Sequence, residues 1–216
     1  MDFLTHLWLP ILLSGVGVWI ASALAWMAIG HHKKDREAIP SEREFMDTIT
    51  RLNIRPGNYG FPDFCQHGKL SPEERKKAMK ALYDTHPQGL LRVWAPTNMG
   101  ANMLITFLFY LVTSAVIAYL GWAALPHGGS VALGAGPGIT GAEGVRGVTG
   151  AGGAGNAMFW KVFQVLGTAG ILAYCFASFP GDLWFQKKRR AMVMDWIDGI
   201  VFGLITGAIF AWLWPR

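Results

Sequence analysis

The sequence predicts an all-α integral membrane protein: a four-helix bundle with both termini on the outer, periplasmic side. Hydrophobic residues make up 52% of the 216-residue chain and charged residues 15%, against roughly 25% charged residues in soluble domains. Four apolar segments are long enough to cross a bilayer. Sixteen of the nineteen Lys and Arg residues lie in residues 31–98 and 182–193, next to those segments. This asymmetry predicts the topology, because basic residues beside spans stay on the cytoplasmic side.

The first apolar segment, residues 7–30, contains no ionisable residue. At about 1.5 Å per residue it exceeds the hydrocarbon core of roughly 30 Å, so we expect it to span the membrane. A cleaved signal peptide is the alternative, because Ala23-Leu24-Ala25 resembles a cleavage site. The chain starts with Asp2 and His6 where a signal peptide carries Lys or Arg, and the apolar run is too long. We therefore favour a span.

The other three spans are expected at residues 101–124, 162–179 and 197–214, none of which contains Lys or Arg. The connecting residues 31–98, 126–156 and 182–193 carry twelve, one and four basic residues respectively. The first and third connections are therefore predicted to be cytoplasmic. Most of the ten Trp residues fall near predicted span ends, where indole rings favour the membrane interface. We expect a multi-pass protein of the bacterial cytoplasmic (inner) membrane.

Small residues predict how the last two spans pack. Gly199, Gly203 and Gly207 recur every fourth residue in span four, and span three offers Ala169, Ala173 and Ala177 at the same spacing. Helices in lipid associate through such close contacts. We expect a tight hairpin of spans three and four. Whether the glycine face contacts span three or a second copy of the chain stays open at this stage.

The cytoplasmic connection, residues 31–98, is predicted to be ordered, with two short amphipathic helices. Ser41 and Ser71 are each followed three residues later by Glu, which is the capping-box pattern of a helix start. Residues 55–62 between them have the composition of a turn. We expect both helices to lie on the inner membrane surface or against the span ends.

The outer connection, residues 126–156, holds twelve of the 27 glycines and is predicted to be a flexible loop. Residues 136–141 match the pattern GxGxxG, but the strand, helix and acidic residue of a dinucleotide site are not predicted around them. No dinucleotide site is therefore expected, and no cofactor is predicted apart from a possible metal.

One group of polar residues at the inner face has the side chains that bind metals. It comprises His31, His32, Asp35, Cys65 and His67. The alternative is that they are interfacial His and Asp residues paired with nearby basic side chains. Asp198 falls one turn inside span four, where a buried carboxylate needs a partner. Lys187, Arg189 or one of the two adjacent histidines are the candidates.

The chain resembles a group of uncharacterised bacterial four-span integral membrane proteins. The residues that carry this resemblance are His31-His32-x-x-Asp35, Pro40, Met46, the turn at residues 56–62 with Cys65, and the C-terminal residues 212–216. The resemblance implies a bacterial membrane protein with a defined cytoplasmic turn. It implies no activity and no catalytic residue.

Three functional hypotheses follow. The first is a structural, interaction or accessory subunit that binds a protein partner or a second copy through residues 31–98 or the glycine face. The second is a small metal- or thiol-dependent redox protein or enzyme. The third is a small transporter, which the absence of ionisable residues at mid-depth in the first three spans disfavours. Nucleic acid is not an expected partner, because nine acidic residues accompany the twelve basic ones in 31–98.

Overall fold

A computed structural model describes residues 2–62, 71–127 and 151–215, with the side chains of residues 75 and 151–155 left undescribed. The described chain is mostly helical and divides into two compact units. One unit comprises residues 1–36 together with 100–216, and the other comprises residues 37–99. Each unit is described below by itself.

Four helical stretches are long and apolar enough to cross a membrane: Asp2–Ile29, Met99–Ala124, Asn156–Trp184 and Arg189–Leu213. The structure therefore contains four helices of the length and composition that the predicted spans require, which is compatible with a membrane protein. The last two stretches extend beyond the predicted 162–179 and 197–214, because those limits followed the apolar runs alone. A helix continues past the apolar run where charged and aromatic side chains can reach the interface, and here Arg189–Ile197 adds more than two turns.

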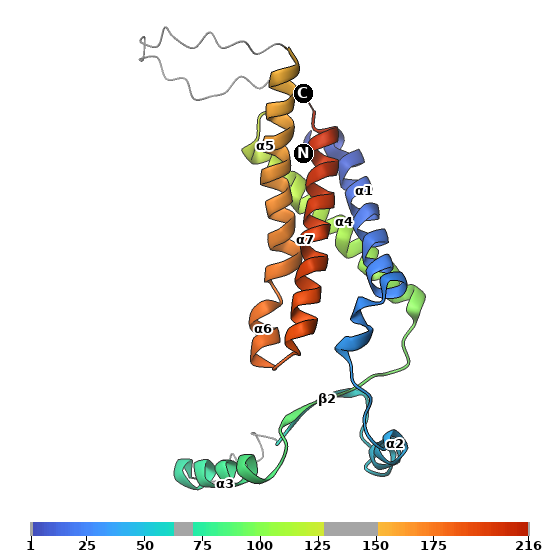
Figure 1. Ribbon diagram of the computed structural model, residues 1–216, viewed down its shortest axis with the longest axis vertical. Helices are drawn as coiled ribbons and strands as arrows, with labels where there is room; N and C mark the ends of the chain where they lie inside the picture. The colour runs from blue at the N-terminus through green and yellow to red at the C-terminus, as the bar shows by residue number, and fades with distance from the viewer. Residues whose placement is uncertain (1, 63–70, 128–150, 216) are drawn as a thin grey trace. The chain divides into compact units, whose positions relative to one another are not determined.

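The helical elements of this unit are α1 (Asp2–Ala23), α4 (Met99–Ala124), α5 (Ala151–Ile171), α6 (Phe179–Trp184) and α7 (Arg189–Leu213). Two short π-helical segments, η1 (Leu24–Ile29) and η3 (Leu172–Phe176), extend α1 and α5. Figure 1 shows α5 and α7 side by side, α1 alongside α7, and α4 crossing behind them. The core of the bundle includes the fully buried Leu7, Leu166 and Phe210.

Glycine allows α5 and α7 to touch through their backbones. A Cβ atom added to Gly203 would lie 2.5 Å from the backbone nitrogen of Ile171, and one added to Gly207 would lie 2.7 Å from Cα of Gly167. Only residues without side chains permit this approach. The glycine face of α7 therefore contacts the other helix of the same hairpin.

The alanine face predicted for the partner helix is wrong at two of its three positions, since only Ala169 packs against the core. Ala173 and Ala177 are exposed, and the backbone of α5 meets α7 at Gly167 and Gly170. The alanine spacing was one of two small-residue patterns on this helix. Spacing alone could not choose between them, because both provide small residues and only packing decides which face turns inward.

A buried chain of hydroxyl groups links three helices in the interior of the bundle. Ser114 Oγ donates to Ser14 Oγ at 3.3 Å, and Ser14 Oγ donates to Thr206 Oγ1 at 3.1 Å. Thr206 Oγ1 in turn donates to the carbonyl oxygen of Phe202 at 2.9 Å. All three hydroxyl residues are fully buried. Hydrogen bonds of this kind hold α1, α4 and α7 together where apolar contact gives little preference over lipid.

The second unit contains α2 (Glu42–Arg51), β1 (Gly57–Phe61), α3 (Pro72–Thr85) and β2 (Gly89–Val93). The two strands pair antiparallel, with Gly57 opposite Val93 and Phe61 opposite Gly89. The prediction of a plain turn at residues 55–62 is therefore incomplete. Pairing with a strand some thirty residues later is a non-local interaction that turn composition does not reveal.

The two predicted capping boxes have different outcomes. At the start of α3, Ser71 N donates to Glu74 Oε2 at 3.1 Å and Glu74 N donates to Ser71 Oγ at 3.4 Å, so this capping box is confirmed. At the start of α2, Ser41 makes no side-chain capping bond, and that prediction is wrong. Its φ of 55° places it in the left-handed region, whereas a capping residue is normally extended.

Replacing Gly203 with Ala is expected to lower the free energy of unfolding by about 1–3 kcal/mol, because the new methyl group meets backbone atoms that cannot move aside. Gly181→Ala on α6 is the matched control, since a Cβ there has nothing within 4 Å. Both changes favour helix equally. Unfolding of the detergent-solubilised protein would measure the difference, and equal stability of the two variants would contradict the packing described.

A candidate functional site of two histidines and two carboxylates

Gly30 makes the turn that builds the site. It ends η1 with a φ of 66° and begins η2 (His31–Asp35), a short 3-10 helix. A left-handed residue at the end of a helix favours glycine, since any Cβ is strained there. The sharp turn brings two consecutive histidines, His31 and His32, against the first turns of α7.

Both histidines contact the same carboxylate on α7. His31 Nε2 lies 3.1 Å from Asp198 Oδ1, and His32 Nε2 lies 2.9 Å from Asp198 Oδ2. The two imidazole rings are 4.2 Å apart between centroids. Each oxygen of the carboxylate is therefore occupied by a different ring.

A second carboxylate and an arginine also hold η2 in this arrangement. His32 Nδ1 lies 2.6 Å from Asp35 Oδ2. Arg190 Nη1 donates to Asp35 Oδ1, and Arg190 Nη2 donates to the carbonyl oxygen of His31 at 2.8 Å. The guanidinium group thus binds both the side chain and the backbone of η2. These bonds fix η2 to the start of α7 in one register.

The His32 ring is enclosed. Only 6% of the His32 surface and 9% of the Asp198 surface is exposed. Trp26 stacks on the imidazole of His32, with ring centroids 4.1 Å apart and an angle of 9° between the planes. A ring held by stacking on one face and by hydrogen bonds at both nitrogens has a single orientation.

The bonding pattern indicates that His32 is an imidazolium. Ionised carboxylates accept hydrogen bonds and do not donate them, so both ring nitrogens must carry a proton to satisfy Asp35 and Asp198. Burial disfavours the charged ring and acts to lower its pKa. The hydrogen bonds and negative charges of Asp198 and Asp35 outweigh burial, and the pKa of His32 is raised above its ordinary value. His32, Arg190 and the two carboxylates then balance in charge.

Lys187, a candidate partner of Asp198, pairs elsewhere. Its ammonium group donates to Asp182 Oδ2 at 3.1 Å and also to Asp195 Oδ2. Burial acts to lower the pKa of Lys187, but its bonds to Asp195 and Asp182 raise it overall. This second ion pair closes the turn between α6 and α7.

Three of the five sequence-derived candidates, His31, His32 and Asp35, lie together in the structure. Cys65 and His67 lie outside the described residues. Asp198, singled out in the sequence only as a buried carboxylate, joins the cluster. Arg190 was not singled out, because it is one of four consecutive basic residues and the sequence does not distinguish among them.

No protein-family model, no curated protein and no solved structure matches this chain. The resemblance to a bacterial family of membrane proteins therefore stays a prediction. The part of it that the structure supports is the presence of four helices that are compatible with membrane spans.

Proposed function

We propose that this chain is a structural or interaction subunit of the bacterial cytoplasmic membrane, which holds residues 37–99 on the cytoplasmic side for a protein partner. Both termini then lie on the outer side. The charge distribution supports this orientation, since residues 31–98, 126–156 and 182–193 carry twelve, one and four basic residues respectively.

One observation carries the proposal of a protein partner. Residues 37–99 form two helices and a strand pair, yet no residue is buried among those that the structure describes in this unit. Large apolar side chains are exposed instead, including Met46 at 59%, Leu52 at 62% and Leu90 at 58%. An isolated two-stranded hairpin is only marginally stable in water. An ordered segment without a core of its own needs another surface to cover its apolar side chains.

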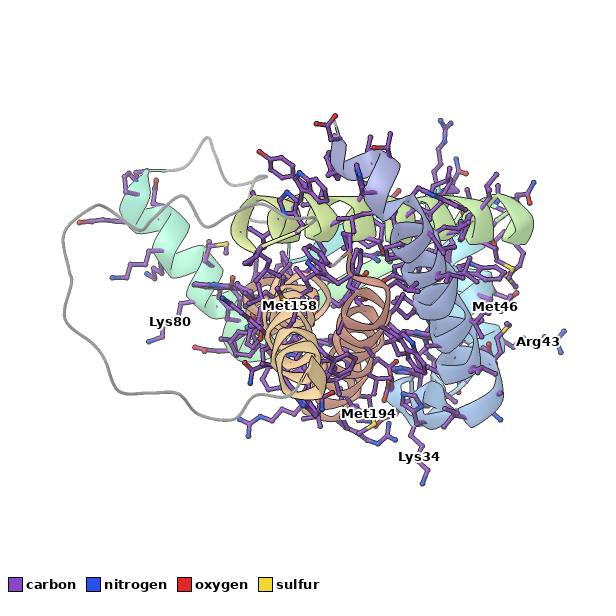
Figure 2. The ribbon with its side chains drawn as sticks, turned by 90° about the horizontal axis from the view of Figure 1, so that it is seen from above. Lys34, Arg43, Met46, Lys80, Met158 and Met194 are labelled. Carbon is purple, nitrogen blue, oxygen red and sulfur yellow. The ribbon has the colours of Figure 1, made fainter. Side chains whose placement is uncertain are left out.

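The charges of this unit favour a protein over an anionic lipid surface. Residues 37–99 contain nine basic and eight acidic residues, a net charge of only +1. In α2 the acidic Glu42, Glu44 and Asp47 outnumber the basic Arg43 and Arg51. Helices that bind anionic membranes carry mostly Lys and Arg on the polar face. Figure 2 shows Arg43 and Lys80 extending away from their own helices.

The candidate site supports the same function. Its bonds fix the C-terminal end of the first span to α7, and the chain leaves η2 at Asp35, two residues before the unit begins. Docking through the glycine face of α7 is the less favoured alternative, because α5 already covers that face. The partner is therefore assigned to residues 37–99.

The orientation predicts the labelling of two introduced cysteines. In a background with Cys65→Ser and Cys175→Ser, Lys77→Cys should react with a membrane-impermeant maleimide only in inverted vesicles. Thr140→Cys should react only in intact cells with a permeable outer envelope. Labelling of both positions from the same side would contradict the four-span orientation.

Hydrogen exchange tests the proposed docking. Peptides covering α2 and the two strands should exchange at least tenfold more slowly in native membranes than in purified protein reconstituted into phosphatidylethanolamine and phosphatidylglycerol vesicles. Partner contact slows the opening of a segment that has no core of its own. Peptides from α7 serve as the internal reference, because they lie in the bundle in both samples.

Two variants sharpen this experiment. Met46→Gln together with Leu52→Gln should remove the extra protection in native membranes, whereas the conservative Arg51→Lys should retain it. If α2 and the two strands exchanged as slowly in the pure lipid vesicles as in native membranes, the membrane surface would be identified as the occupant. That result would overturn the proposal. Rapid exchange in both samples would also overturn it, because no surface would then cover the segment.

A further inference from the structure

We infer that His31, His32 and Asp198 form a binding site for one divalent transition-metal ion. This inference is independent of the proposed docking function, since all three residues belong to the helical unit. Each residue offers one ligand atom, and these atoms all lie within 4.8 Å of one another. They come from two rigid elements, η2 and α7, so the set is already assembled.

The observed separations suit a shared ion. Two ligands of one tetrahedral zinc ion, each about 2.0–2.1 Å from the metal, lie roughly 3.3 Å apart. The imidazole nitrogens of His31 and His32 lie 3.1 Å and 2.9 Å from the carboxylate oxygens of Asp198. To share one ion, the two rings must turn their Nε2 atoms toward a common point beside Asp198, within a set of ligand atoms that already lie within 4.8 Å of one another.

The surroundings of His32 match the support that metal-binding histidines receive. Such a histidine usually donates its second ring N–H to a carboxylate, which fixes the ring and makes the ligand nitrogen more basic. Asp35 occupies this position at 2.6 Å from Nδ1, and Arg190 holds Asp35 in place. Trp26 closes one face of the ring.

The donor set selects the class of ion. Two imidazole nitrogens and one carboxylate suit zinc or ferrous iron, whereas magnesium and calcium prefer oxygen ligands alone. Three protein ligands leave at least one coordination position for water or another small ligand. His31 is partly exposed while His32 is buried, so the side of the cluster at His31 provides access for the ion.

The cluster can exchange a proton for the metal ion and keep its other contacts. The ion replaces the proton on Nε2 of His32, and that proton passes to solvent, because a coordinating nitrogen must be unprotonated. His31 also coordinates through Nε2, as the neutral tautomer that carries its proton on Nδ1. The proton on Nδ1 stays between His32 and Asp35. Asp198 changes from accepting two hydrogen bonds to binding the cation, and Asp35 and Arg190 keep their contacts.

The test uses the full chain, purified in detergent with any affinity tag removed and with metals stripped by a chelator. Equilibrium dialysis should show one saturable equivalent of Zn²⁺ per chain, undiminished by a large excess of Mg²⁺. Co²⁺ should give the visible absorption of a four- or five-coordinate ion. Absence of saturable Zn²⁺ binding and of a Co²⁺ spectrum would overturn the inference.

Variants identify the ligands. His31→Gln and Asp198→Asn should each weaken Zn²⁺ binding at least tenfold and change the Co²⁺ spectrum. Asp35→Asn should weaken it by about 10–100-fold, as expected for a supporting contact. The exposed His86→Gln is the matched control and should bind normally. Circular dichroism and elution as a single species establish that each variant is folded. If a variant does not fold, His31→Asn takes its place in the Co²⁺ measurement.

A last variant separates this site from the other metal-binding side chains of the sequence. Cys65→Ala with His67→Ala should keep full Zn²⁺ binding. Binding lost in this variant but retained in Asp198→Asn would overturn the assignment of the three ligands. Neither result bears on hydrogen exchange of residues 37–99, so the failure of one proposal is distinguishable from the failure of the other.

Discussion

The arrangement of the first span depends on the pairing of the Asp198 carboxylate with two histidines. The carboxylate lies in the third turn of α7, is almost fully buried, and contacts two consecutive histidines of η2. A carboxylate in such a place is unfavourable unless it is paired. The pairing therefore constrains where α1 must end and how its last residues turn. Gly30 permits that turn, and Arg190 and Asp35 fix its register.

Three kinds of contact hold the bundle together. Along most of their length, α5 and α7 approach through glycine, so their association depends on van der Waals contact between backbones. The first and second spans join through buried hydroxyl groups, with Ser14 between Ser114 and Thr206. The charged cluster is confined to one end. A position at one end is compatible with a membrane helix bundle, because the cost of a charge in a bilayer falls toward the interface.

The sequence was sufficient to predict four spans, the glycine face and the burial of Asp198, because these depend on composition and local spacing. It predicted the capping box at Ser71 for the same reason. It did not predict the strand pair of residues 57–61 and 89–93 or the choice of Gly167 over the alanines of α5, since both depend on contacts between distant segments. Most of the cluster was predicted: His31, His32 and Asp35 were candidates, and the two histidines were among the partners proposed for Asp198. Arg190 was indistinguishable from its basic neighbours. Only the packing of η2 on α7 identifies it.

The most direct test of this account is a double-mutant cycle between Asp198 and His32, measured as unfolding free energy in detergent with a chelator present. Asp198→Asn and His32→Gln should each destabilise the protein, and the double variant should be less destabilised than the sum, with a coupling of about 1–3 kcal/mol. The pair Asp198→Asn and His86→Gln is the control and should be additive within about 0.5 kcal/mol. Additivity for His32 as well would show that the carboxylate does not hold the first span in place.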